Sequence, residues 1–169
     1  MSKILIDKIR IDGFRGLKDF EIPFSETSVL TGMNNAGKTS VLKALQIVFS
    51  NFSFLSVEDL HIENNVRAEK IIVDVRIIAV DDEGKRLEDF SEDWDIVLKA
   101  ANIEHDIEGR AYVAFRSVFS TSTTQGNFTK ETKKLVAWEQ DGVDWRDLQT
   151  TTKFQVPTEQ LPFFYIEAQ

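Results

Sequence analysis

The stretch Gly32-Met33-Asn34-Asn35-Ala36-Gly37-Lys38-Thr39 decides how the rest of the chain is interpreted. It fits the spacing Gly-x-x-x-x-Gly-Lys-Ser/Thr, which is typical of a phosphate-binding P-loop. The two glycines allow close approaches that a Cβ would block, so that several N–H groups face one concavity. The lysine offers a mobile charge to β- and γ-phosphates, and the threonine hydroxyl is placed to bind Mg²⁺. We expect a nucleotide to be bound by Gly32, Asn34, Asn35, Ala36, Gly37, Lys38, Thr39 and Ser40, with Thr39 as the Mg²⁺ ligand.

The flanks of this loop strengthen the prediction. Val29-Leu30 is a short apolar run that indicates the end of a strand. After the loop, apolar residues recur with the spacing of a helix that buries one stripe, at Val41, Leu42, Leu45, Val48 and Phe49. A strand, a loop and a helix in this order place the helix N-terminus, with its positive dipole end, at the anion.

Length and composition indicate a single domain with a core of its own. The chain has 169 residues, of which 42% are hydrophobic and 28% charged. The absence of cysteine excludes disulfides, thiolate chemistry and cysteine-based zinc sites. No apolar run approaches the roughly 20 residues of a membrane span, and charge interrupts the N-terminus too early for a signal peptide. We therefore expect a cytoplasmic protein with no membrane partner.

The net charge of −8 is unevenly distributed. Residues 58–108 contain 16 Asp and Glu against 6 Lys and Arg, whereas the rest of the chain contains 12 against 14. A strongly acidic segment does not follow a phosphate backbone. Any contact with DNA would use segments outside this sequence or the N-terminal cluster of Lys8, Arg10, Arg15 and Lys18.

Residues 1–62 are predicted to form a P-loop lobe. Alternating apolar residues predict a strand over 4–12, a tight turn at 13–16, and a second strand over 20–24 that pairs back on the first. The helix after the P-loop should end near Ser50-Asn51, and a short helical turn is expected around 57–60. Two strands before the loop are unusual for small-molecule kinases of the P-loop class.

Residues 63–160 are predicted to form an antiparallel β-rich insertion, because they lack the alternation of strands and helices of a doubly wound fold. Strands are expected over 71–79, 110–119 and 135–138, and a helix over 94–98. Residues 120–129 form a polar loop. Asp141-Gly142 is a hairpin signal into residues 143–145.

The apolar run Phe163-Phe164-Tyr165-Ile166 is typical of a strand covered on both faces. We expect residues 161–169 to return to the nucleotide-binding sheet. Because the sequence stops just after this run, it is expected to be the N-terminal part of a longer chain.

The segment Ile9-Arg10-Ile11-Asp12-Gly13-Phe14-Arg15-Gly16-Leu17, followed by a strand and by residues 32–45, resembles the N-terminal signature of the RecF/SMC branch of ABC-type ATPases. Within that branch it is most similar to the ATP-dependent endonucleases of the OLD (overcoming lysogenization defect) family. The similarity is specific over residues 4–50, weaker over the β-rich segment, and modest at 161–169. The fold class that it implies is mixed α/β (α+β): a P-loop NTPase of ABC/RecF/SMC type with an antiparallel β subdomain.

The resemblance implies ATP and Mg²⁺ as cofactors and places Arg15 near the nucleotide or the partner surface. It also implies that two ATPase heads form a homodimer around ATP and act on DNA. In OLD proteins a Toprim nuclease domain follows, and many act in phage defence or DNA repair. No such domain lies in this sequence.

Parts of the hydrolytic machinery are not evident. Hydrolysis needs a Mg²⁺-binding aspartate at a strand end and a carboxylate that orients water. Asp74 follows an apolar run but is expected on the polar face of its strand, where an ordinary solvated residue is the plainer interpretation. Glu167 ends the last apolar run, and Gln169 stands where the family's Q-loop glutamine could fall as a second Mg²⁺ ligand. No Leu-Ser-Gly-Gly-Gln-like signature is present.

Alternatives remain open at this point. The chain could belong to a RecF/SMC-like DNA-repair ATPase without a nuclease, or form a nucleotide-dependent interaction module that does not hydrolyse ATP. Arg15 could be a turn residue that only packs. His61 and His105 are isolated, so a metal role is the less favoured interpretation. A GTPase or small-molecule kinase is disfavoured, because no Asn-Lys-x-Asp motif for guanine is present.

Overall fold

One antiparallel sheet runs through the computed structural model, which describes residues 2–24, 35–121 and 126–158. Its strand order is β2-β1-β5-β7-β8-β9, and β6 pairs with the start of β7. The strands are β1 (Lys3–Asp12), β2 (Phe20–Pro23), β5 (Lys70–Val80), β6 (Glu104–His105), β7 (Ala111–Thr121), β8 (Phe128–Leu135) and β9 (Thr150–Lys153). A separate two-stranded hairpin pairs β3 (Ile62–Glu63) with β4 (Val66–Arg67).

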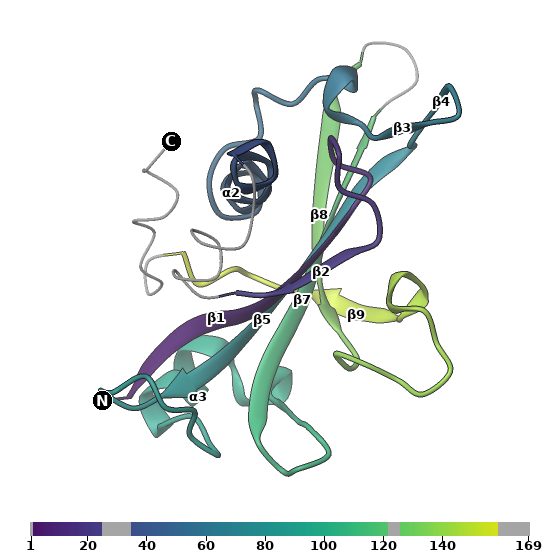
Figure 1. Cartoon of the computed structure of the whole chain (residues 1–169). Helices are drawn as coiled ribbons and strands as arrows, with labels where there is room; N and C mark the ends of the chain where they lie inside the picture. Colours follow the sequence, from purple (N-terminus) through teal and green to yellow (C-terminus); the bar gives the residue numbers. More distant parts are fainter. Residues whose placement is uncertain (1, 25–34, 122–125, 159–169) are drawn as a thin grey trace.

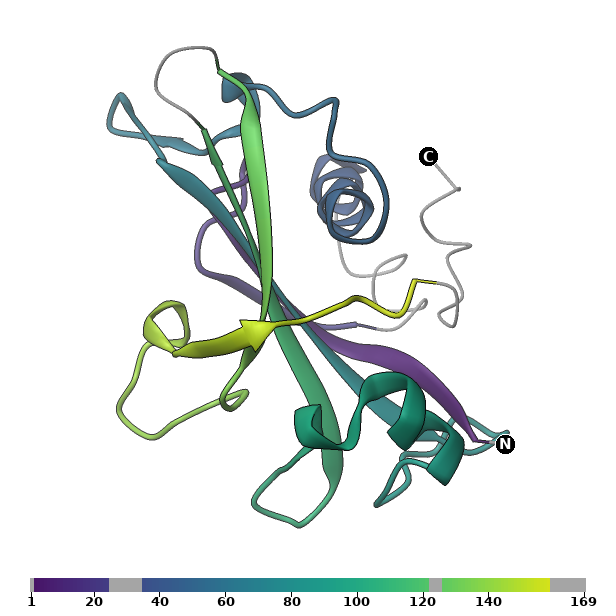
Figure 2. The same ribbon diagram turned by 180° about the vertical axis from the view of Figure 1, so that it is seen from behind.

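Helix α2 (Asn35–Phe49) packs against one face of this sheet, whereas the long loop between β8 and β9 lies on the other face (Figure 1). The view from behind shows the same two layers and places α3 (Glu92–Leu98) at the end of the sheet near the N-terminus (Figure 2). Short 3-10 turns are η1 (Val57–Asp59), η2 (Ala100–Asn102) and η3 (Trp145–Asp147). Within the described ranges, no helix is both long enough and apolar enough to cross a bilayer.

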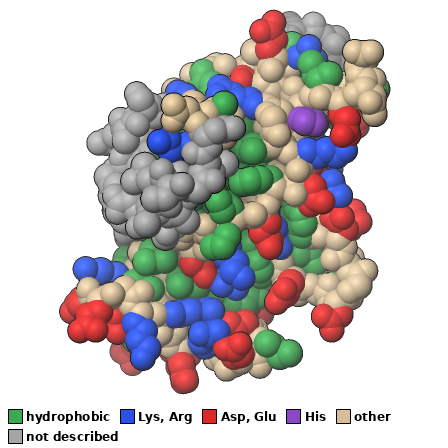
Figure 3. All heavy atoms as spheres, in the orientation of Figure 1, with side chains coloured by type: hydrophobic (Ala, Val, Ile, Leu, Met, Phe, Trp, Pro, Cys, Tyr) green, Lys and Arg blue, Asp and Glu red, His purple; other side chains and the backbone are tan. Residues whose placement is uncertain are grey.

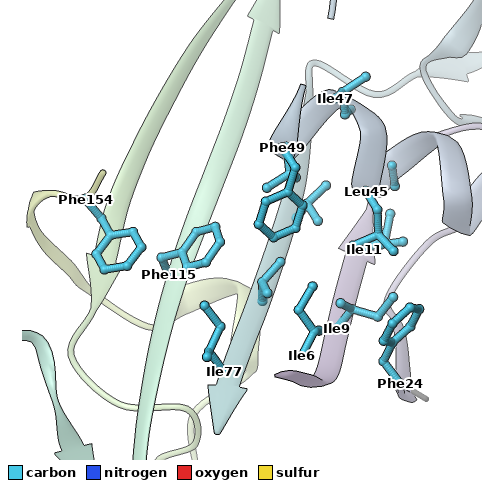
Figure 4. Close-up of a cluster of buried hydrophobic side chains, with 14 of the residues drawn as sticks. Ile6, Ile9, Ile11, Phe24, Leu45, Ile47, Phe49, Ile77, Phe115 and Phe154 are labelled. Atoms are coloured by element: carbon cyan, nitrogen blue, oxygen red, sulfur yellow. The ribbon is translucent and has the colours of Figure 1, made fainter. Parts of the chain in front are cut away.

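A β-bulge in β1 keeps its isoleucines on the face that α2 covers. Side chains alternate along a regular strand, so Ile6 and Ile9 would point to opposite faces. The register with β5 shifts between Ile6 and Lys8, and Ile4, Ile6, Ile9 and Ile11 all join the same buried cluster. Figure 4 shows Ile6, Ile9 and Ile11 gathered below α2. The bulge thus keeps isoleucines on both sides of it in the cluster under the helix.

Strand β5 is buried on both faces from Ile71 to Val80. Its odd-numbered residues pack in the main cluster under α2, whereas Ile78 and Val80 join a second cluster with Leu135, Trp138 and Leu148. The expectation that Asp74 is a solvated strand residue is therefore wrong, because this side chain is fully buried. The loop between β8 and β9 covers the sheet face opposite α2, which would otherwise be exposed to water.

Two further predictions in this region are wrong. The strand expected over 135–138 lies earlier, at Phe128–Leu135, and Val136 to Trp138 start the covering loop. Asp141-Gly142 does form a turn, but the chain then enters the 3-10 turn η3 instead of a strand. The side chain of Asp144 accepts a hydrogen bond from the Arg146 N–H and so caps η3, which favours the helical turn over extended pairing.

Several sequence-based predictions are confirmed. The strands expected over 4–12, 20–24, 71–79 and 110–119 are present, as are the helical turns around 57–60 and 94–98, and the fold is of the mixed α/β class. The division of the chain at residue 62 stays a prediction, and the pairing of β1 with β5 continues across it. Residues 25–34, 122–125 and 159–169, including the expected return strand, lie outside the described residues.

Candidate functional site

The second half of the P-loop motif forms the start of helix α2. The helix begins at Asn35, so that Ala36, Gly37, Lys38 and Thr39 lie in its first turns, where backbone N–H groups lack helical partners. Gly37 and Lys38 are half-buried, Thr39 is exposed and Ser40 is buried. No acidic side chain occupies the first turn. Within the described residues, no acid of the first turn offsets the positive dipole of this helix end, which therefore suits an anion. Gly32, Met33 and Asn34 lie outside the described residues.

The position of α2 is fixed by a buried stripe. Val41, Ala44 and Leu45 are fully inaccessible to solvent and face the isoleucines of β1 and β5. Burial of a Val or Leu side chain contributes about 1.5–3 kcal/mol each. At the other end, the ring of Phe49 meets Phe115 of β7 edge-on with centroids 6.0 Å apart (Figure 4). The helix is thus held along its length, which fixes its N-terminus relative to the sheet.

Arg15 lies in the turn between β1 and β2 and is held by the last residue of η1 and by His61. Its Nε donates to Asp59 Oδ1 at 3.0 Å, and its backbone N–H donates to the Asp59 carbonyl at 2.6 Å. The Arg15 carbonyl accepts a hydrogen bond from His61 Nδ1 at 2.7 Å. Among the described residues, its ionic and hydrogen-bond partners come from 59–61 and not from α2. Its role at a nucleotide stays a prediction.

The turn that carries Arg15 is also fixed by packing and by hydrogen bonds of its neighbouring residues. Phe14 is fully buried and forms bridges with Leu17 and Leu60. Gly13 has φ +82°, and a Cβ there would stand 2.2 Å from the Lys70 carbonyl oxygen, so only glycine fits this approach. The N–H of His61 donates to the Gly13 carbonyl at 2.9 Å. The turn is therefore a rigid platform with Arg15 at its surface.

Asp74 lies at the centre of a buried ionic cluster on the face opposite α2. Its Oδ2 accepts from Arg10 Nε at 3.1 Å and from Arg10 Nη2 at 2.8 Å. From Arg116, Nε donates to Oδ1 at 2.7 Å and Nη2 to Oδ2 at 2.9 Å. The exposed fractions of Asp74, Arg10 and Arg116 are 0%, 1% and 5%. Asp74 is fully buried and accepts four hydrogen bonds from two guanidinium groups, which argues against its role as the Mg²⁺ aspartate.

The two arginines of this cluster also hold the covering loop. Arg10 Nη1 donates to the Trp138 carbonyl at 2.6 Å, and its guanidinium stacks 3.5 Å above the Trp138 ring. Arg116 donates to the carbonyls of Trp145 and Leu148 at 2.6 Å and 3.1 Å. Burial lowers the pKa of Arg10, and Asp74 opposes that shift. The cluster thus ties three strands to one loop and serves the fold.

The remaining candidates are dispersed. His61 contacts the Arg15 carbonyl, and His105 lies 3.6 Å from Asp89 at the surface. The described part of the chain contains no group of three or more His, Asp or Glu side chains that could hold a metal ion. Glu167 and Gln169 lie outside the described residues.

Sequence reasoning missed two features of this region. Nothing in a single sequence indicated that Asp59 and His61 contact Arg15, because 44 residues separate Arg15 from Asp59. It also missed the capping of α2 by Lys130, whose Nζ donates to the Ile47 carbonyl at 2.9 Å from β8. The sequence did contain one kind of signal for buried polar contacts. It was a charged residue within an apolar strand, such as Arg116 in β7.

Comparisons with known proteins agree with this geometry. A family model described as an AAA ATPase domain matches residues 5–156. A protein of Helicobacter pylori (strain ATCC 700392 / 26695), named ATP/GTP phosphatase, is 32% identical over 68 residues. That match covers 40% of this chain and 18% of the relative, so the chain spans well under two thirds of that protein's length.

Proposed function

The chain belongs to the AAA ATPase domain family, and on this premise we propose that it binds Mg-ATP through residues 32–40 and forms part of an ABC-type ATPase head. One observation carries the proposal: Gly37, Lys38 and Thr39 lie in the first turns of a helix that is fixed by its buried stripe and has no acid there. Such a helix start offers backbone N–H groups at its positive dipole end to a polyphosphate.

The residues present fit the nucleotide and its metal ion. Lys38 would pair with the β- and γ-phosphates, and the exposed Thr39 hydroxyl would bind Mg²⁺, which takes few protein ligands. Bound Mg²⁺ would neutralise charge on the phosphate oxygens. We assign Ser40 and the motif residues before Gly37 to contacts with the phosphates, and Arg15 to a further phosphate contact.

For the whole protein we propose an OLD-like ATP-dependent endonuclease that processes DNA, with two ATPase heads as a homodimer. The support is the resemblance of residues 4–50 and the name of the H. pylori relative, which describes cleavage of ATP or GTP. On the face drawn in Figure 3, the described Lys and Arg side chains are interspersed with Asp and Glu. We therefore do not assign contact with DNA to this face.

A second candidate is an interaction module that binds ATP without hydrolysing it. The burial of Asp74 between Arg10 and Arg116 favours it, because this aspartate is engaged in an ion-pair cluster away from solvent. A RecF/SMC-like ATPase without a nuclease shares the same ATP site. The three candidates predict different activities of the full-length protein. The endonuclease releases phosphate and cleaves DNA, the RecF/SMC-like ATPase releases phosphate without cleaving DNA, and the interaction module does neither.

The decisive experiment is titration of the full-length protein with Mg-ATP, comparing Lys38→Ala with Lys43→Ala. Both changes remove one lysine from α2, but only Lys38 belongs to the motif. We expect Lys38→Ala to abolish measurable binding while its melting temperature stays close to that of the unaltered protein, and Lys43→Ala to keep its affinity. Equal affinity in the Lys38→Ala variant would refute the proposal.

A further inference from the structure

Three basic residues form a row across strands β7, β8 and β9, on the sheet face opposite α2. Arg116 is the register partner of Lys133, and Lys133 is in turn the register partner of Lys153. Leu135 lies two residues after Lys133 on the same strand and belongs to the buried cluster of that face, which places the row there. Directly opposed side chains of antiparallel strands lie about 5 Å apart, and like charges in such a pair are destabilising. The row therefore calls for a counter-charge.

The described residues supply only part of that counter-charge. Arg116 is engaged by Asp74, which accepts from its Nε at 2.7 Å. Lys133 Nζ lies 2.8 Å from Glu131 Oε1, whereas Lys153 forms no ion pair within the part of the chain that the structure describes. Hydrogen bonding to Lys133 lowers the pKa of Glu131, and the charge of Lys153 adds to this shift. Two ammonium groups thus share one exposed carboxylate.

A cavity of about 210 Å³ lies beside this row. Its lining comes from β7, from β8 and β9 and from the end of the loop between them, and consists of Arg116, Val118, Glu131, Lys133, Leu148 and Thr150. Val118 and Leu148 give it apolar walls, and Lys133 and Glu131 give it a charged rim. Pockets for complete small-molecule ligands measure about 300–1,000 Å³, so this cavity suits a single side chain.

Strand β9 adds a free sheet edge next to the cavity. It is the last strand in the order of the sheet, and among the described residues only β8 pairs with it. Thr151, Thr152 and Lys153 are exposed. An edge strand can accept a further strand through its N–H and C=O groups, and a pocket beside the edge then selects among the incoming side chains.

The surrounding charges favour an acidic peptide over a nucleic acid. Residues 136–149, which lead into β9, contain four acids against one arginine. A run of phosphates along this surface would meet those acids as well as Glu131. A single carboxylate would instead meet the two lysines alone, and an ammonium group binds it as a compact point charge.

We propose that the edge of β9 and the cavity beside it form a docking site for an extended acidic segment of a partner protein. The backbone of that segment pairs with residues 151–153, and one of its Asp or Glu side chains enters the cavity and is neutralised by Lys133 and Lys153. This site lies outside the nucleotide-binding motif, and the inference does not depend on ATP binding.

The test uses a fluorescein-labelled peptide of alternating valine and glutamate as the probe. Fluorescence anisotropy measures its binding to the full-length protein at about 50 mM NaCl, and a peptide with glutamine in place of glutamate is the control for charge. We expect the glutamate peptide to bind and the glutamine peptide to bind at least about tenfold more weakly. Two further peptides, N-methylated on either the valine or the glutamate nitrogens, test the backbone pairing. One of them should lose binding and the other should retain it, because alternate residues of a strand direct their N–H groups to opposite edges.

Three protein variants assign the binding to this surface. Lys153→Glu reverses the unpaired charge and should weaken binding of the glutamate peptide at least about tenfold. Glu131→Gln removes the carboxylate that competes for the two lysines, so it should strengthen binding about threefold. Lys85→Ala, an exposed lysine in the turn after β5, is the control and should leave the affinity unchanged. Melting temperatures of all three variants should match that of the unaltered protein, since the substituted side chains are exposed.

Several outcomes would overturn the inference. Equal affinity for the glutamate and glutamine peptides, or an affinity that Lys153→Glu does not change, would show that the lysines do not select the ligand. A single-stranded oligonucleotide that binds more tightly than the peptide, and loses affinity in Lys153→Glu, would make the occupant a nucleic acid. Self-association of the protein that Lys153→Glu abolishes would assign the edge to a second copy of this chain.

Discussion

Lys130 on strand β8 caps the C-terminus of helix α2. Its Nζ donates to the Val48 carbonyl at 2.5 Å and to the Ile47 carbonyl at 2.9 Å, two groups that the last helical turn leaves unpaired. A cation at this end also complements the helix dipole. The ammonium is partly buried where it reaches these carbonyls, and this burial lowers the pKa of Lys130. The helix that carries Lys38 at its start is thus fixed to the sheet at its end.

Replacing this lysine should loosen the helix end. Lys130→Met keeps the length of the side chain but leaves both carbonyls without their donor, so we expect a loss of about 1–2 kcal/mol in the free energy of unfolding. Urea denaturation followed by circular dichroism measures it. Lys133→Met is the control on the same strand, because Lys133 forms its ion pair with the exposed Glu131 and not with a helix end. Its effect should stay within about 0.5 kcal/mol, and equal losses in the two variants would argue against capping.

Removing the acid from the buried ionic cluster should be more damaging. Asp74→Ala leaves Arg10 and Arg116 buried without their counter-ion, a change of about 3–5 kcal/mol in other proteins. We expect a large fall in the urea midpoint and faster proteolysis within the loop between β8 and β9. Asp82→Ala, in an exposed turn, is the control and should behave like the unaltered protein. A stability loss below about 1 kcal/mol for Asp74→Ala would contradict the central place of this cluster.

Comparing alanine substitutions at two glycines with the same backbone conformation distinguishes backbone strain from steric clash. Gly13 and Gly84 have φ of +82° and +85°, but a Cβ at Gly13 would meet the Lys70 oxygen at 2.2 Å, whereas nothing lies within 4 Å at Gly84. Gly84→Ala should therefore cost only the left-handed strain, about 1 kcal/mol. Gly13→Ala must also displace the turn that carries Arg15, and we expect at least about 3 kcal/mol by thermal denaturation. Similar melting temperatures for the two variants would show that the turn yields easily.

The sequence predicted those elements whose pattern is local. The motif at 32–39, the alternation in β1 and β5, and the apolar stripe of α2 all follow from spacing along the chain. Strand β8 was missed because it carries Lys130, Lys133 and Lys134, which look like a solvated loop. The amine of Lys130 instead reaches helix carbonyls, and the amine of Lys134 reaches Glu104.

The same limit applies to the candidate site. The motif residues could be chosen from the sequence, but Asp59 and His61 could not, because their link to Arg15 exists only after the chain folds. Asp74 was misjudged for a related reason. Period-two alternation identifies the second face of a strand, but it does not tell whether water or a loop covers that face.

The Asp144–Arg146 pair in η3 gives a prediction that depends on pH. Asp144 Oδ1 accepts from the Arg146 N–H at 2.9 Å and from its Nε at 3.0 Å, and these bonds hold the pKa of Asp144 at about 2, below its usual 3.8. Because the pKa is depressed in the folded state, the pair stabilises the protein above pH 3.8, and that contribution is lost as the pH falls towards about 2. Asp144→Asn keeps a capping oxygen but has no proton to bind, so it isolates the charge.

We therefore expect the difference in unfolding free energy between the unaltered protein and Asp144→Asn to be constant above about pH 5 and to shrink below about pH 4. The pair is exposed, so about 1 M NaCl should reduce the difference at neutral pH as well. Urea denaturation at a series of pH values measures both effects. A difference that persists unchanged at pH 2.5 would contradict this prediction, because the charge of the Asp144 carboxylate could not then be its cause.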